Sequence, residues 1–234
     1  LAQGVPFSTS VLGAQVAARN GIPAVVLPHF HMEDRYYHWR QFYDVFGTVE
    51  AVIAAPAASK PVFFDLIGAN AQVAPGGGFD ASDFSAESLA RGREAFRRIH
   101  AGENPFVLVL GRKTGAKNYR MIVQACEQLR VAGHRLDVVL IGPDDDGIAL
   151  EGPGVHYYGA QPREVVIGAL AGSLCLANMS ESESFGIVLL ESWMATRPVV
   201  ARSSTLAFTE LVQDGHNGFL ADNVGDVAGA IKRY

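Results

Sequence analysis

Short apolar runs alternate with helix-like stretches from one end of this sequence to the other. The apolar runs, rich in valine, leucine and isoleucine, fall at residues 23–27, 49–54, 71–74, 106–110, 136–141, 155–158, 174–177 and 199–201. Helix-like stretches fall at residues 8–20, 34–46, 56–67, 83–100, 118–132 and 163–171. Strands of this kind are buried on both faces, and the helices between them supply the crossovers that parallel strands need. The pattern therefore predicts an α/β fold built on parallel sheets.

A turn-rich passage, Pro-Gly-Gly-Gly-Phe-Asp at residues 75–80, interrupts this alternation. We place a domain boundary there, with residues 1–80 as the latter half of one α/β domain and residues 81–234 as most of another. The chain starts at Leu1 and stops inside an apparent helix. We therefore expect a piece of a longer protein that is cut at both ends.

Composition excludes several classes of protein. With 49% hydrophobic and 18% charged residues the chain is an ordinary globular protein, and a net charge of −5 provides no basic field for nucleic acid. No apolar run approaches the roughly 20 residues that a transmembrane helix needs. Cys126 lies in a helix-like stretch and Cys175 in a strand-like one, so we expect two buried thiols and a cytoplasmic location.

Two glutamates flank the start of a predicted helix late in the chain. The apolar run at 174–177 ends in polar residues, and a helix is expected to open at Ser184 and to close before Pro198. Glu183 then lies where a strand end meets a helix N-terminus. Glu191 follows eight residues later, which is about 12 Å along a helix axis.

Carboxylates spaced in this way suit two hydroxyl-bearing parts of one long ligand. The N–H groups of the first helical turn, near Phe185 and Gly186, favour a phosphate between them. A sugar, a diphosphate and a ribose fit that description. The structural alternative makes Glu183 a helix cap and Glu191 a solvated helix residue.

This segment resembles a known family. Residues 183–191, Glu-Ser-Phe-Gly-Ile-Val-Leu-Leu-Glu, match the E-x7-E signature of retaining glycosyltransferases of the GT-B fold, family 4 (glycosyl transferases group 1). Residues 194–201 and 210–220 match that family's next segments. Two departures stand out: Thr196 replaces a usual Gly, and Ser203-Ser204 precede Thr205 and Leu206 where a Gly-Gly pair is common.

The resemblance implies two Rossmann-like parallel-sheet domains, the first incomplete. Residues 1–80 would belong to the acceptor-side domain and residues 81–234 to the domain that binds a nucleoside-diphosphate sugar. The implied activity is metal-independent, retaining, hexosyltransferase-like transfer to a glycan, lipid or small-molecule acceptor. Glu183 would hold donor-sugar hydroxyls and Glu191 the ribose. No cofactor is implied beyond the donor, peripheral membrane contact of a longer protein stays open, and the fragment alone is expected to be inactive.

Arg112 and Lys117 are the candidate phosphate clamp. They follow the apolar run at 106–110 and precede a helix, and their cationic groups suit a diphosphate. The family places an Arg and a Lys at these positions for that task. The alternative is a solvated loop charge and a surface lysine, and Lys113 is predicted to be such a surface charge.

The family also carries a His six residues after the Pro of an N-terminal strand, which here is His29, after Pro23. His31 is the nearest rival for the same place beside the reacting sugar. His29, His31, Glu33 and Asp34 also allow a metal site, but three of these residues are spread over a loop of unknown shape, which argues against it.

Three smaller features follow the next two strands. Residues 144–146, Asp-Asp-Asp, could suggest a metal-binding acidic motif, but a solvated acidic turn is favoured. Gly142 and Tyr158, at consecutive strand ends, resemble the family's wall for the nucleotide base.

Two other functions stay open. One is a sugar-nucleotide 2-epimerase of the same architecture, although we recognise no acid/base arrangement for it. The other is a non-catalytic binding module, either a nucleotide-sugar-binding remnant or a two-domain solute-binding protein. A solute-binding protein would carry an export signal and would not need Arg112, Lys117 and Glu191 together.

Overall fold

The computed structural model describes residues 1–4, 8–66, 68–74 and 77–234. Its contacts divide the chain into two compact units. The first contains residues 1–78 with 182–186 and 205–211, and the second contains residues 79–181, 187–204 and 212–234. Positions 75 and 76 of the turn-rich passage, and position 67 at the end of a predicted helix, lie outside the described residues.

The first unit contains a parallel four-stranded sheet. Its strands, in the order β1-β2-β3-β4, are Ala2–Gln3, Val25–Leu27, Ala51–Ala54 and Ala71–Val73. Its helical segments are α1 (Ser8–Arg19), the 3-10 turn Arg35–His38, α2 (Arg40–Phe46), the 3-10 turn Ala57–Ser59, the π-helical turn Val62–Leu66 and α7 (Leu206–Thr209). Phe30, Phe46 and Phe63 form the centre of its core.

Two helices predicted in this unit are broken into shorter pieces. The predicted helix at 34–46 is split at Trp39, whose backbone is extended (φ −76°, ψ 137°). The predicted helix at 56–67 consists of two short turns on either side of Lys60 and Pro61. Proline lacks the N–H that a continuous helix would need at this point.

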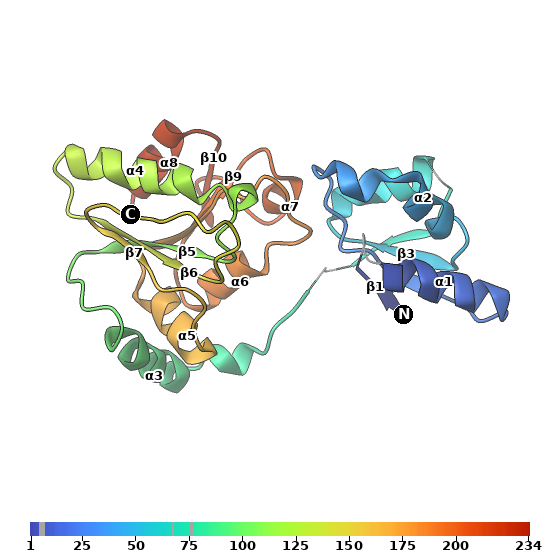
Figure 1. Cartoon of the computed structure of the whole chain (residues 1–234), viewed down its shortest axis with the longest axis horizontal. Helices are drawn as coiled ribbons and strands as arrows, with labels where there is room; N and C mark the ends of the chain where they lie inside the picture. The colour runs from blue at the N-terminus through green and yellow to red at the C-terminus, as the bar shows by residue number, and fades with distance from the viewer. Residues whose placement is uncertain (5–7, 67, 75–76) are drawn as a thin grey trace. The chain divides into compact units, whose positions relative to one another are not determined.

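The second unit contains a parallel six-stranded sheet (Figure 1). Its strands are β5 (Phe106–Leu110), β6 (Asp137–Ile141), β7 (Val155–Tyr157), β8 (Cys175–Asn178), β9 (Val199–Arg202) and β10 (Gly218–Ala221). Its helices are α3 (Ala86–Arg97), α4 (Tyr119–Val131), α5 (Arg163–Gly172), α6 (Ile187–Met194) and α8 (Val224–Ile231), with 3-10 turns at Ala81–Phe84 and Gly115–Lys117.

The strand order of this sheet is β10-β9-β8-β5-β6-β7. The chain starts in the middle with β5, adds β6 and β7 on one side, and then returns to place β8 on the other side of β5. This is the doubly wound Rossmann order, whose direction reverses between β5 and β8. The carboxyl ends of these two strands are therefore the expected place for a ligand.

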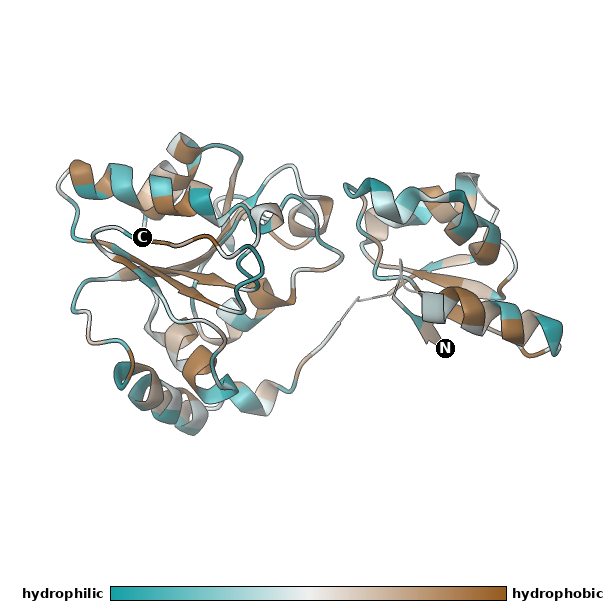
Figure 2. Cartoon of the chain, in the orientation of Figure 1, coloured by the Kyte–Doolittle hydropathy of each residue, from teal (hydrophilic) through white to brown (hydrophobic). Residues whose placement is uncertain are grey.

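Burial explains why the strands could be located from their composition. Val107, Leu108, Val138 and Val139 are all fully buried, and Figure 2 shows the strands of this sheet as strongly hydrophobic. Figure 1 shows α4 and α8 together on one face of the sheet and α3 and α5 together on the other. A sheet covered on both faces needs apolar residues at every strand position.

Helix α6 begins at Ile187, three residues later than the predicted start at Ser184. The reason is Gly186, whose φ of +85° is incompatible with a right-handed helix. An added Cβ on Gly186 would also lie 2.8 Å from the Phe208 ring. The backbone between Glu183 and Glu191 is therefore helical only from Ile187, so the separation of about 12 Å expected for a continuous helix does not apply.

Helix α6 ends in a Schellman motif at the position where this chain lacks the family's usual glycine. The Thr196 amide donates to the Trp193 carbonyl at 2.8 Å, and the Arg197 amide donates to the Ser192 carbonyl at 2.8 Å. This pattern places Thr196 at the left-handed position of the motif, and its φ is +60°. A β-branched residue is strained in this conformation.

We therefore expect Thr196→Gly to stabilise the protein. A left-handed non-glycine residue costs about 1–2 kcal/mol, and the extra freedom of glycine in the unfolded chain offsets part of the gain. The free energy of unfolding in urea should rise by about 0.5–1 kcal/mol. Thr196→Ala, which keeps a Cβ, is the matched control and should raise the free energy of unfolding by less. A Gly variant no more stable than the Ala variant would contradict the strain at this position.

Candidate functional site

Two glycines bring the ends of β5 and β6 unusually close together. Gly142 has a φ of +150°, and an added Cβ there would lie 1.8 Å from the Gly111 carbonyl oxygen. The Gly111 amide donates to the Ile141 carbonyl at 3.0 Å, and the Gly142 amide donates to the Gly159 carbonyl at 2.8 Å. No other residue type fits at Gly142 without moving the loop that carries Arg112.

Lys113 is buried, so the prediction that it is a surface charge is wrong. Its side chain is 2% exposed. Its ammonium group donates to Asp144 at 2.7 Å, to the Ile148 carbonyl at 2.8 Å and to Asp146. Asp146 also accepts a hydrogen bond from the Tyr119 hydroxyl at 2.8 Å. Two members of the predicted solvated acidic turn are thus ion-pair partners of a buried lysine.

This ion-pair cluster shifts the pKa values of its members. Burial by itself lowers the pKa of Lys113, but the hydrogen bonds to Asp144 and Asp146 outweigh it, and the net pKa is raised. The hydrogen bond from Lys113 is also the main reason why the pKa values of Asp144 and Asp146 are lowered. Both carboxylates are therefore ionised at neutral pH and bound to a cation of the protein itself.

Arg112 and Lys117 lie in the loop between β5 and α4. Arg112 is largely exposed and forms an ion pair with Asp145 at 3.3 Å. Lys117 is half-buried and ends the 3-10 turn that precedes α4. The Glu181 amide donates to the Ala116 carbonyl of this turn at 2.9 Å. The segment that leaves β8 thus contacts the loop that carries both predicted phosphate ligands.

Glu183, Phe185 and Gly186 lie between β8 and α6, in the segment 182–186 that groups with the first unit. Glu183 and Phe185 are half-buried, and Gly186 is buried. Because α6 begins at Ile187, both Phe185 and Gly186 precede its first turn. Their role as phosphate ligands stays a prediction.

Glu191 is a buried residue of α6 that is paired with an arginine. It is 8% exposed, and its Oε1 accepts a hydrogen bond from Arg163 Nη1 at 2.6 Å. Arg163 also donates to Asp83 at 3.1 Å, and its guanidinium lies over the Phe84 ring. The alternative of a solvated Glu191 is therefore wrong.

Arg163 was not predicted as a site residue, although the sequence holds a signal for it. Arg163 directly follows Pro162 and is the first residue of α5. A cation at a helix N-terminus opposes the positive end of the helix dipole, so it needs a local anion. Here Glu191 and Asp83 both provide one.

Gly142 and Tyr158 were predicted to form the base wall. The Tyr158 hydroxyl is 2.8 Å from His100 Nδ1, and the Tyr158 ring packs edge-on against Phe96. The side chain thus lies in an aromatic cluster under α3, while its amide donates to the Leu140 carbonyl at the strand ends. Any contact of this residue with a base at that edge would involve its backbone.

In the first unit, His29 follows β2 and is a left-handed residue, with φ +48°. Its rival His31 stacks on Tyr37, with ring centroids 4.7 Å apart. Sparsely populated backbone conformations of this kind cluster at functional sites. Within the described residues, no group of three His, Cys, Asp or Glu side chains is arranged to hold a metal ion.

Ser203 and Ser204, in the stretch that lacks the family's usual Gly-Gly pair, bind Asp222, which follows β10. Both hydroxyl groups donate to the Asp222 carboxylate, that of Ser204 at 2.9 Å, and the Ser204 amide donates at 3.2 Å. The hydrogen bond from Ser203 is the main reason why the pKa of Asp222 is lowered. The loop after β9 is thus tied to the neighbouring strand end by side chains.

Comparison with known proteins decides the family. The sequence pattern of the family described as glycosyl transferases group 1 matches residues 91–234, which is more than half of the chain. The chain belongs to this family. Of the described helices, moreover, none has the length and apolar character needed to cross a membrane.

One relative is the phosphatidyl-myo-inositol mannosyltransferase of Propionibacterium freudenreichii subsp. shermanii. It is 32% identical over 168 residues, which is 71% of this chain and 41% of that protein. This chain thus spans less than half the length of that relative.

Solved structures show the same fold. Anabaena Alr3699/HepE in complex with UDP and glucose matches with a TM-score of 0.78 at 21% identity, over 98% of this chain and 67% of that one. The UDP-forming α,α-trehalose-phosphate synthase of Burkholderia xenovorans in complex with glucose-6-phosphate matches with a TM-score of 0.78 at 14% identity, over 96% and 63%. The two parallel sheets are those of a GT-B glycosyltransferase, as the sequence predicted.

The Lys113 cluster generates a prediction about acid stability. Lys113→Met removes the cation and leaves Asp144 and Asp146 without their partner, so the thermal midpoint at pH 7 should fall by about 5 °C or more. Both aspartates have pKa values below 3.8 in the folded protein. Their contribution is therefore present above pH 3.8 and is lost as the pH falls below it.

The difference between the wild type and the Met variant should accordingly shrink from pH 7 to pH 3. Thermal unfolding followed by circular dichroism measures it. Arg112→Met, which breaks an exposed ion pair instead, is the control and should change the midpoint little. A difference that does not depend on pH would refute this account of Lys113.

Proposed function

We propose that this chain contains the donor-binding part of a retaining glycosyltransferase. It would transfer a sugar from a nucleoside diphosphate to an acceptor such as a glycan, a lipid or a small molecule. Arg112 and Lys117 would bind the diphosphate, Glu183 the donor-sugar hydroxyls and Glu191 the ribose, with His29 beside the reacting sugar. Substitution would occur on the same face of the anomeric carbon.

The main support for the proposal is that charged residues lie at the carboxyl ends of β5 and β8, where the strand order reverses. Arg112 and Lys117 follow β5, and the segment leading to Glu183 follows β8, the neighbour of β5 in the sheet. The crevice at such a reversal is where open parallel sheets bind their ligands. Cationic groups placed there would stabilise the charge that develops on the leaving diphosphate.

We also propose that the reaction needs no metal. Asp144 and Asp146 are bound by Lys113, and Asp145 pairs with Arg112, so these three carboxylates are not disposed to hold a divalent cation. The neutralisation of the diphosphate would then come from side-chain cations and backbone N–H groups.

The first test is binding of uridine, guanosine and adenosine diphosphates by calorimetry. Arg112→Ala and Lys117→Ala should each weaken binding of the preferred diphosphate about ten- to a hundred-fold, because each removes a charge-assisted hydrogen bond of roughly 1.5–3 kcal/mol. Binding of the bare nucleoside should change much less, and EDTA should leave diphosphate binding intact. Absence of diphosphate binding, or binding that EDTA abolishes and manganese restores, would overturn the proposal.

Catalysis needs a separate measurement on the full-length product of the gene. Release of sugar from nucleoside-diphosphate sugars, with retention at the anomeric carbon, separates a transferase from a binding module. Inversion at C2 of the nucleotide sugar, with no transfer to an acceptor, would instead indicate the 2-epimerase.

The second test concerns Glu191. Glu191→Ala should weaken binding of a ribonucleoside diphosphate about tenfold or more and spare its 2′,3′-dideoxy analogue, which has no hydroxyls for the carboxylate to bind. Arg163→Met is the matched control, since it breaks the same ion pair but keeps the carboxylate. Equal losses for both nucleotides in the Ala variant would mean that Glu191 only stabilises α5 and α6, and its role as ribose ligand would be withdrawn.

A further inference from the structure

The second unit has a cavity of about 500 Å³ at the opposite edge of its sheet. It lies at the amino ends of the strands, beside Phe106 at the start of β5 and Leu174 just before β8. Its other walls come from the C-terminal parts of α3 and α5 and from the turn after α6. Arg112, Lys117 and Glu191 do not line this cavity. The volume falls in the usual range for sites of small ligands.

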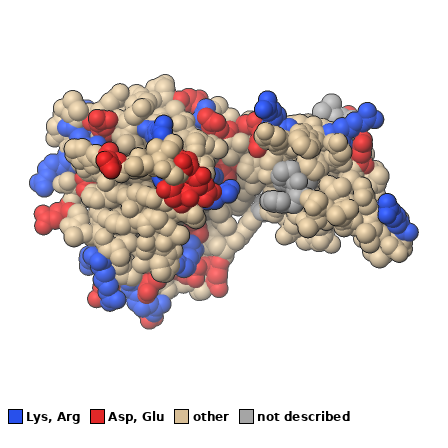
Figure 3. Space-filling model, in the orientation of Figure 1, with Lys and Arg blue, Asp and Glu red and all other residues tan. Residues whose placement is uncertain are grey.

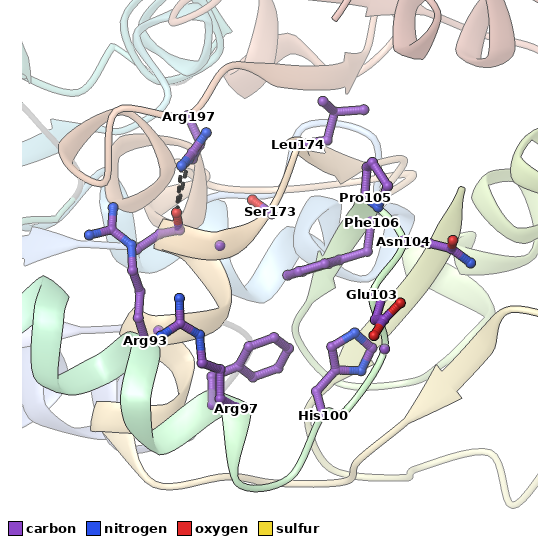
Figure 4. A pocket seen from close by; sticks show the side chains of 15 residues that line it. Arg93, Arg97, His100, Glu103, Asn104, Pro105, Phe106, Ser173, Leu174 and Arg197 are labelled. Atoms are coloured by element: carbon purple, nitrogen blue, oxygen red, sulfur yellow. Dashed lines mark hydrogen bonds between the residues drawn. The ribbon is translucent and has the colours of Figure 1, made fainter. Parts of the chain in front are cut away.

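Three arginines line this cavity on one side (Figure 4). Arg93 and Arg97 are one helical turn apart on α3 and therefore project from the same face. Arg197 comes from the turn after α6. In the described ranges neither Arg93 nor Arg97 forms an ion pair. Figure 3 shows basic side chains gathered over α3, with acidic ones among them.

Tight packing fixes α3, which carries two of these arginines, against α5. Helices α3 and α5 cross at Gly92 and Gly168, where an added Cβ on Gly168 would lie 1.8 Å from the Gly92 carbonyl oxygen. This contact brings Arg93 over the C-terminal part of α5. The Arg197 guanidinium is anchored there as well, because its Nε and Nη2 donate to the Ala171 carbonyl at 3.1 and 2.6 Å.

The far wall carries one acid and one polar atom without a partner. Glu103 lines the rim opposite the arginines, so the cavity has an excess of two positive charges. His100 is 5% exposed, and its Nε2 makes no hydrogen bond within the part of the chain that the structure describes. A buried polar atom of this kind normally has a partner.

We propose that this cavity binds a small phosphate monoester, at a site separate from that of the nucleotide. A monoester has a charge of about −1.5 to −2 at neutral pH and three acceptor oxygens, which matches the charge excess and the guanidinium donors. Phe96 and Phe106, which also line the cavity, provide an apolar floor for the organic part of the ligand. The proposal extends beyond the proposed function and does not depend on it.

Calorimetry with glucose 6-phosphate, inorganic phosphate and glucose tests the site on the whole chain. Glucose 6-phosphate should bind with submillimolar affinity, inorganic phosphate more weakly, and glucose not at all. The double variant Arg93→Ala/Arg97→Ala should lose about tenfold or more in affinity for glucose 6-phosphate. Arg98→Ala, at the C-cap that directly follows α3 and outside the cavity, is the matched control and should stay within about twofold.

A second variant tests the proposal by a gain in affinity, which a folding defect cannot imitate. Glu103→Gln removes the opposing carboxylate and should strengthen binding of glucose 6-phosphate about two- to fivefold. Binding of the nucleoside diphosphate should be unchanged in the α3 variants, and binding of glucose 6-phosphate should be unchanged in Arg112→Ala. The proposal is overturned if the wild type does not bind glucose 6-phosphate at millimolar concentration, or if Arg98→Ala loses as much affinity as the double variant.

Discussion

All strands of the second unit run in the same direction, and this constraint shapes both edges of its sheet. Parallel strands cannot be joined by tight hairpins, so every connection returns over a face of the sheet and every strand ends at one edge. The loops after β5, β6, β8 and β9 consequently lie along one line. The predicted donor ligands Arg112, Lys117 and Glu191 belong to elements at that edge, whereas the arginine-lined cavity occupies the other.

The loops at one edge of the sheet also bring like charges together, and ion pairs with a partly or fully buried cation neutralise these charges. Asp144 and Asp146 would repel each other in an open turn, but Lys113 is buried between them and takes up both charges. Arg163 plays the same part for Glu191 and Asp83. Each cation connects two elements that are distant in sequence, so these pairs fix the geometry of the loops as well as their charge.

The sequence was most informative where local pattern decides structure. The strands at 106–110 and 136–141 were predicted almost to the residue, because strands buried on both faces are apolar at every position. The reversal between β5 and β8 could not be read from composition, since it depends on which strand pairs with which. The start of α6 was misplaced because the left-handed backbone of Gly186 depends on its packing against Phe208.

Among the candidate site residues, sequence reasoning failed where the partner is far along the chain. Lys113 looks like its exposed neighbour Arg112, and only the return of the chain at Asp144 and Asp146 makes it a buried residue. For Glu191 the sequence predicted a ribose ligand, with a solvated helix position as the alternative, and it gave no sign that α5 places Arg163 against the carboxylate. In both cases the residue of opposite charge is far away in the sequence, so the pattern of residues around the site could not identify it.

The two departures from the family pattern have opposite physical consequences. In the stretch that lacks the Gly-Gly pair, Ser203 and Ser204 form side-chain hydrogen bonds to Asp222 that glycines could not make, so this loop is more constrained. Thr196 keeps the left-handed conformation that suits glycine and therefore carries strain. The next residue in this turn is Arg197. Its amide donates to the Ser192 carbonyl, and its guanidinium donates to the Ala171 carbonyl near the end of α5. The backbone conformation at Thr196 thus sets the direction from which Arg197 enters the cavity, so relief of the strain by glycine should preserve the position of this arginine.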